Sequence, residues 1–163
     1  MNEPFEILRY FDPVLFCPSL TATDKRAALR EMVRIVTAGK DVRDPDLLLE
    51  MLERRESLGS TGIGKGVAIP HGRSLAVVHL KVVFGRSEKG IDFDAIDGKP
   101  VRLFFLIVAP PQDERNEYLP LLGRIAELVK DKKVRDRLLK VTDFGQLRTV
   151  LEDGALHVDK TDD

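Results

Sequence analysis

The chain has a single cysteine, Cys17, among its 163 residues, and it has no tryptophan. One cysteine cannot form a disulfide within the chain, and it cannot build a cysteine metal cluster. A chain without disulfide bonds fits a reducing compartment. We therefore expect a cytoplasmic protein without a metal centre.

The sequence also lacks an excess of one charge and a long hydrophobic run. Its 26 basic and 27 acidic residues give a formal charge of −1. Nucleic acids and anionic membranes attract basic surfaces, so this balance predicts neither partner. The longest apolar run, residues 103–111, is far shorter than the roughly 20 residues that span a bilayer. The N-terminal residues MNEPFEILRYFDP do not have the basic start and apolar core of a signal peptide. We expect no insertion into a membrane.

The first third of the chain has two helical patterns. Thr23 or Asp24 can cap the first, which ends at Gly39 and carries apolar residues at i, i+3, i+4 and i+7. The second starts at residues 44–45, with proline in the first helical position. Its apolar row is Leu48, Met51 and Leu52. The next position in that row is Arg55, so we expect Arg55 to face inward.

Strand patterns follow, and the last third of the chain is helical. Residues 66–70, 77–87 and, weakly, 91–96 have strand patterns, and His79 lies in the second of these. Residues 101–109 (VRLFFLIVA) are apolar at nearly every position, which is typical of a central strand covered on both faces. Three helices are predicted after it, and Gly154 is expected to end the last.

This order of elements predicts an α/β fold. We expect a single domain over residues 1–155, in which a mixed sheet of four or five strands lies between helices. Residues 156–163 are expected to form a frayed tail.

The stretch GSTGIGKGVAIPHGR, residues 59–73, contains the most unusual local sequence. Its start matches a P-loop, but Gly66 stands where a serine or threonine would ligate magnesium. A strand-like run then follows in place of the helix that would hold phosphates. The dinucleotide fingerprint is absent too, because Val67 occupies the third glycine position. Nucleotide binding is therefore disfavoured.

His71 lies between Pro70 and Gly72 in this stretch. The glycines could serve only the backbone, by permitting positive φ and close approach. Alternatively, the proline restricts the backbone before the ring and the glycine leaves open space after it, which suits a transient nucleophile. Both interpretations stay open, since a lone loop histidine usually has no catalytic role.

Residues 53–64 (ERRESLGSTGIG), 67–72 (VAIPHG) and 93–97 (FDAID) together resemble a known active-site signature. It is that of the enzyme IIA domain of the bacterial phosphoenolpyruvate-dependent phosphotransferase system. The resemblance spans nearly the whole chain and points to the fructose/mannitol class, especially its stand-alone nitrogen-regulatory members. It implies an α/β sandwich and a phosphohistidine carrier that needs no cofactor.

The resemblance implies that His71 accepts a phosphoryl group from the phosphocarrier protein HPr or its nitrogen-branch relative. The group would then pass to a cysteine of a IIB protein, or its presence would control regulatory target proteins. A stand-alone regulatory role is favoured over sugar uptake. The alternative is a non-catalytic regulatory binding module that keeps the fold, with slow or absent phosphotransfer.

The resemblance also assigns a phosphate-binding arginine to Arg55, whose alternative role is to cover a helix end. Ser60 and Thr61 could donate hydroxyl hydrogen bonds to the phosphate, or they could simply form a turn. We expect three glycines to keep the docking rim around the histidine low: Gly64, Gly66 and Gly72.

Tyr118 is a departure from the family pattern, which has a second histidine at this position. We expect Tyr118 to direct its hydroxyl toward the His71 ring, close to the free N–H groups at the start of a helix. A phenol can donate a hydrogen bond but cannot become cationic. A tyrosine at this position therefore predicts that His71 is still phosphorylated, but that onward transfer is slower than in a relative with the second histidine.

Overall fold

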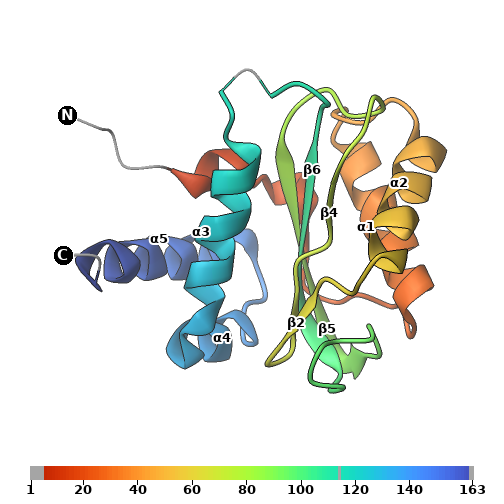
Figure 1. Ribbon diagram of the computed structural model, residues 1–163. Coiled ribbons are helices and arrows are strands. Elements are labelled where there is room, and N and C mark those ends of the chain that lie inside the picture. The colour runs from red at the N-terminus through yellow and green to blue at the C-terminus, as the bar shows by residue number, and fades with distance from the viewer. Residues whose placement is uncertain (1–5, 114, 162–163) are drawn as a thin grey trace.

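A mixed sheet lies between two layers of helices (Figure 1). The computed structural model describes residues 6–113 and 115–161. The predicted α/β sandwich with a mixed central sheet is confirmed. Across the described residues, no helix is both long and apolar enough to cross a membrane.

The sheet has six strands, against the four or five expected. They are β1 (Phe16–Cys17), β2 (Gly62–Gly64), β3 (Val67–Ala68), β4 (His71–Arg73), β5 (Lys81–Ile91) and β6 (Val101–Ala109). Their order is β1-β5-β6-β3-β2, and β4 also pairs with β6. Strands β5 and β6 are antiparallel, whereas β3 and β4 run parallel to β6. Four of the strands are only two or three residues long, too short to produce a periodic pattern.

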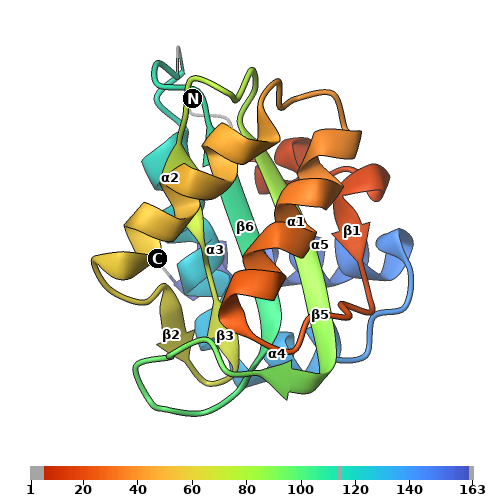
Figure 2. The ribbon, with the colours of Figure 1, turned by 90° about the vertical axis from the view of Figure 1, so that its right-hand side faces the viewer.

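Helices cover both faces of the sheet (Figure 2). One face is covered by α1 (Lys25–Ala38) and α2 (Pro45–Ser57), and the other by α3 (Tyr118–Lys130), α4 (Lys132–Leu138) and α5 (Phe144–Thr161). Two 3₁₀ turns, Ile7–Tyr10 and Pro13–Leu15, precede β1. The Asp24 carboxylate caps α1, and that of Asp44 caps α2 by accepting from the backbone N–H of Leu47. Both predicted helix starts are confirmed.

Strand β6 is the centre of the core. Phe105 and Ile107 pack with α3–α5, while Phe104 and Leu106 pack with α1 and α2. All four side chains are fully buried, which confirms a central strand covered on both faces.

The structure corrects several predicted boundaries. Helix α5 continues through Gly154 to Thr161, and an added Cβ at Gly154 would lie 2.8 Å from Cδ2 of Leu128 on α3. The glycine therefore permits close helix packing and does not end the helix. The last two residues of the predicted tail lie outside the described residues, and the domain limit at 155 stays a prediction.

Strand β5 begins at Lys81, so His79 precedes it instead of lying within it. His79 is exposed, and its Nδ1 lies 3.0 Å from Oδ1 of Asp41. Ile91 ends β5, and the weakly alternating residues after it form a loop. Hydrophobic periodicity alone did not separate these loop residues from strand residues.

Candidate functional site

His71 is the first residue of β4, at a break in the strand that pairs with β6. Both β3 and β4 pair in parallel with β6, and Ile69 and Pro70 separate them. The backbone carbonyl of Ile69 lies 2.8 Å from Nδ1 of the His71 ring. A carbonyl oxygen only accepts hydrogen bonds, so Nδ1 carries the hydrogen and Nε2 keeps its lone pair.

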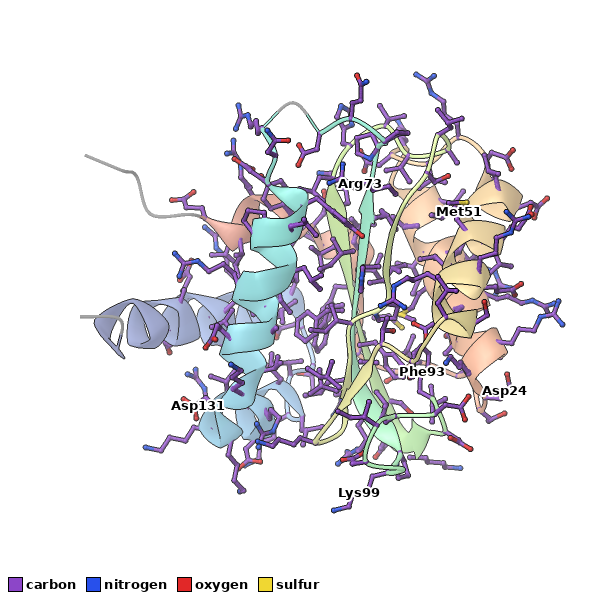
Figure 3. All side chains as sticks on the ribbon, in the orientation of Figure 1. Asp24, Met51, Arg73, Phe93, Lys99 and Asp131 are labelled. Carbon is purple, nitrogen blue, oxygen red and sulfur yellow. The ribbon has the colours of Figure 1, made fainter. Side chains whose placement is uncertain are left out.

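The alternation of β4 places neighbouring side chains on opposite faces of the sheet. A Cβ at Gly72 would lie 3.4 Å from Cδ2 of Leu52 on α2. His71 and Arg73 face the other side, where both approach Tyr118 of α3. The ring centroids of His71 and Tyr118 are 6.3 Å apart, and Cζ of Arg73 lies 4.6 Å from the Tyr118 centroid. Arg73, labelled in Figure 3, is the last residue of β4, and its side chain lies against Tyr118 at the start of α3.

Tyr118 begins α3 and is buried. Oδ2 of Asp113 accepts hydrogen bonds from the backbone N–H groups of Glu117 (2.5 Å) and Tyr118 (2.9 Å). These first-turn donors, expected to favour a phosphate, are thus already used within the protein. Among the described side chains, the Tyr118 hydroxyl makes no hydrogen bond with His71; the two residues meet as rings tilted by 55°.

Two guanidinium groups, those of Arg73 and Arg55, influence the pKa of the Tyr118 phenol. Burial raises the pKa of the phenol above its ordinary value, while the charges of Arg73 and Arg55 oppose that rise. The phenol therefore stays neutral near neutral pH, and both arginines lie close enough to influence it. Arg73 was not identified from the sequence.

Arg55 lies in the last turn of α2 and is partly exposed. Its Nη1 donates a 3.0 Å hydrogen bond to the carbonyl oxygen of Gly59. The predicted inward-facing row is out of phase, because Met51 is 37% exposed and the buried row is Leu48, Leu52 and Glu56. Arg55 is therefore at the side of the helix and not on its buried face.

Glu56 is a buried carboxylate that the sequence did not reveal; only 8% of the residue is exposed. Its Oε2 accepts from the backbone N–H of Thr61 at 3.1 Å and lies 2.8 Å from Nζ of Lys25. Its Oε1 accepts from the Thr61 hydroxyl. Lys25 also lies 4.9 Å from the centroid of the Phe93 ring. This network ties the glycine-rich loop to α1 and α2.

The hydroxyls of Ser60 and Thr61 are both used inside the protein. The Ser60 hydroxyl donates to the carbonyl oxygen of Phe93 at 2.9 Å and accepts from the N–H of Gly62 at 3.0 Å. The Thr61 hydroxyl donates to Glu56, and Thr61 is 4% exposed. Neither hydroxyl proton is free for a phosphate in this state, so the turn-forming interpretation fits the geometry better.

The glycines expected on the docking rim have different local reasons to be glycine. Gly64 and Gly66 have φ angles of 94° and 79°, which most other residues rarely adopt. Gly72 needs no positive φ, and its missing side chain leaves room for Leu52.

The arrangement provides one imidazole nitrogen with a free lone pair and two nearby guanidinium groups. A neutral imidazole is a nucleophile, and guanidinium groups match the charge and shape of phosphoryl oxygens. No group of three or more metal-binding side chains is present in the part of the chain that the structure describes. The geometry therefore suits the transfer of an anionic group to His71.

Comparison with known proteins shows the family of the chain. Residues 9–154 match the family described as "Phosphoenolpyruvate-dependent sugar phosphotransferase system, EIIA 2". The chain is 35% identical over 141 residues to a nitrogen regulatory protein of Bradyrhizobium diazoefficiens, covering 85% of this chain and 90% of that one. It is 34% identical over 122 residues to a fructose-specific EIIABC component of Bacillus subtilis, covering 75% of this chain but 19% of that protein.

Among solved structures, nitrogen regulatory protein IIA-Ntr from Neisseria meningitidis superposes with a TM-score of 0.82. It is 31% identical, and the match covers 89% of this chain and 98% of that one. The chain belongs to the EIIA 2 family of the phosphoenolpyruvate-dependent sugar phosphotransferase system.

Proposed function

We propose that His71 is the residue of this phosphotransferase component that accepts the phosphoryl group, and that its Nε2 is the attacking nitrogen. The main support for this proposal is the 2.8 Å hydrogen bond between Nδ1 and the Ile69 carbonyl, which leaves the Nε2 lone pair available. As the new N–P bond forms, positive charge develops on the ring, and the carbonyl stabilises the proton on Nδ1.

The donor is an HPr-like phosphocarrier, and the acceptor is a IIB protein or a regulatory target. A regulatory role is supported by the nitrogen regulatory relatives, which this chain matches over most of their length. The same relatives do not favour the alternative of a non-catalytic binding module. The expected location is the cytoplasm.

Arg55 binds the phosphoryl oxygens in this proposal. Its guanidinium uses one donor on the Gly59 carbonyl, and a guanidinium has five N–H groups. Ser60 and Thr61 hold the loop in shape through their hydrogen bonds to Phe93 and Glu56.

The phosphocarrier docks on a rim that includes Gly64 and Gly66, together with apolar side chains near the site. Four exposed apolar residues lie on or beside the elements that form the site: Leu58, Ile63, Ile96 and Leu119. Such partly apolar, weakly charged surfaces suit transient and fairly small interfaces.

The test is incubation with phosphoenolpyruvate, enzyme I and an HPr-like carrier, followed by peptide mapping under alkaline conditions that preserve phosphohistidine. Acid-labile phosphate should appear on the peptide that contains His71. The matched control is the exposed His79, so His79→Ala should be phosphorylated normally and His71→Ala should not. Undiminished phosphate on His71→Ala would contradict the proposal.

A further inference from the structure

We propose that Arg73 is a second phosphate-binding residue at His71, and that the Tyr118 ring positions it. This inference rests on the proposed phosphorylation of His71. Tyr118 cannot provide a positive charge beside the phosphoryl group, because the buried phenol stays neutral and a phenol has no cationic form. Arg73 provides that charge.

The strand brings Arg73 to the correct face. His71 and Arg73 are the first and last residues of β4 and pair in regular register with Ile107 and Ala109 of β6. Residues two apart in a strand point to the same face, and their Cα atoms are about 6.6 Å apart. A phosphoryl group on Nε2 of His71 is thus within reach of a long side chain from position 73.

Two contacts hold the Arg73 guanidinium. Its Cζ lies 4.6 Å from the Tyr118 ring centroid, within the range of a cation–π interaction. Its Nη1 donates a 3.1 Å hydrogen bond to the carbonyl oxygen of Pro111. Only one of its five N–H donors is used by that bond. A guanidinium that is already positioned loses less conformational freedom when it binds an anion.

The Tyr118 ring lies next to both the His71 imidazole and the Arg73 guanidinium. Its centroid lies 6.3 Å from that of His71 and 4.6 Å from Cζ of Arg73. Tyr118 is fixed in turn by burial and by the Asp113 cap on its backbone N–H. The face of the ring, and not its hydroxyl, is therefore the feature that positions Arg73.

The transfer step is balanced without a further reactant. The N–P bond of the donor phosphohistidine breaks and its electron pair stays on the donor nitrogen, while the Nε2 lone pair of His71 forms the new N–P bond. The Nδ1 proton remains on His71, held by Ile69. Negative charge on the three phosphoryl oxygens is stabilised by the guanidinium groups of Arg55 and Arg73.

The test compares Arg73→Gln with Arg54→Gln, a control that removes an arginine exposed on α2 and paired with Glu50. Phosphorylation of His71 is followed with the HPr-like carrier and with phosphoramidate, a small donor that needs no protein docking. Arg73→Gln should slow both reactions about tenfold or more, and Arg54→Gln should slow neither. Added guanidinium ion should restore part of the lost rate.

A merely structural role for Arg73 predicts no rescue by guanidinium ion, and an effect on docking alone predicts a normal rate with phosphoramidate. Either result overturns the inference. The role of Tyr118 is tested by comparing Tyr118→Phe, which keeps the ring, with Tyr118→Leu, which removes it. Tyr118→Leu should slow the transfer as much as Arg73→Gln does, and Tyr118→Phe should slow it less. An equal rate for Tyr118→Phe and Tyr118→Leu contradicts positioning by the ring. If the wild-type protein itself accepts no phosphate at His71, the proposed function fails and not this inference alone.

Discussion

Nζ of Lys25 lies 2.8 Å from Oε2 of Glu56, so the first turn of α1 is bonded to the buried end of α2. The side chain of Glu56 is 5% exposed and that of Lys25 is 21% exposed. The same carboxylate holds the backbone N–H and the hydroxyl of Thr61. One buried charge therefore fixes the loop that leads to His71.

Glu56→Gln should destabilise the protein by about 2 kcal/mol or more, because it removes the carboxylate 2.8 Å from Lys25 and weakens the bonds to Thr61. Lys25 then keeps its longer, 3.8 Å contact with the exposed Asp94. Urea unfolding measures this change. The control is Glu53→Gln, whose ion pair with Arg26 (3.3 Å) joins side chains that are 36% and 68% exposed and should contribute less than about 1 kcal/mol. Equal losses for the two variants would show that burial of Glu56 gives its ion pair no special importance.

Tyr118 should titrate above its ordinary pKa of 10.0, because burial penalises the phenolate. The chain has two tyrosines and no tryptophan, so Tyr10→Phe leaves Tyr118 as the only phenol in an ultraviolet titration. Arg73→Gln in that background should raise the pKa further, since its positive charge lowers it in the native protein. A midpoint at or below 10 would contradict the burial of this phenol.

The same shift predicts how stability depends on alkaline pH. The folded phenol keeps its proton at pH values where the unfolded phenol has lost it, so stability falls as the pH rises above about 10. Tyr118→Phe should lack this part of the loss. The measurement is the urea midpoint of both proteins at pH 8 and pH 10.5; identical declines would exclude a contribution from Tyr118.

Arg55→Lys should fold normally and transfer phosphate about tenfold or more slowly. Lysine keeps the positive charge and can still reach the Gly59 carbonyl, but it loses the planar fork that matches phosphoryl oxygens. The matched control is Arg54→Lys on the exposed side of the same helix. Transfer from the carrier is measured by stopped flow. A wild-type rate for Arg55→Lys would mean that Arg55 only caps the end of α2.

Gly72→Val should lower stability by about 1–3 kcal/mol, because its branched side chain would press on Leu52. The sequence instead predicts that Gly72 keeps the docking rim around His71 low. Gly72→Ala places only a Cβ at 3.4 Å from Leu52 Cδ2, so it should change stability far less. Thermal unfolding of both variants measures this change in stability. A fully stable Gly72→Val would indicate that Gly72 instead gives the phosphocarrier access to His71.

The parts of the fold that the sequence predicted are those with local causes. Asp24 and Asp44 cap helices through hydrogen bonds to residues three positions ahead, so a short motif is enough to predict them. Strand β6 was predictable because burial on both faces requires an apolar residue at nearly every position. The role of Gly154 cannot be predicted locally, because the close packing that requires a glycine there involves Leu128 of another helix.

Residues of the candidate site that lie in a sequence motif can be proposed from the sequence, whereas those that the tertiary fold brings together cannot. His71 stands out between proline and glycine, but Glu56 required the correct phase of α2. Met51 suggested a row through Arg55, whereas the buried positions repeat every four residues through Glu56. Arg73 could have been found from strand alternation after His71, once residues 71–73 were recognised as a strand. Its contact with Tyr118 needs the tertiary fold.

The most direct test of the account is nuclear magnetic resonance of the ¹⁵N-labelled protein after phosphorylation by the HPr-like carrier. Phosphorus should couple to Nε2 of His71, while Nδ1 keeps its hydrogen bond to the carbonyl of Ile69. Phosphate on Nδ1 of His71, phosphate on another residue, or no phosphate at all would contradict it.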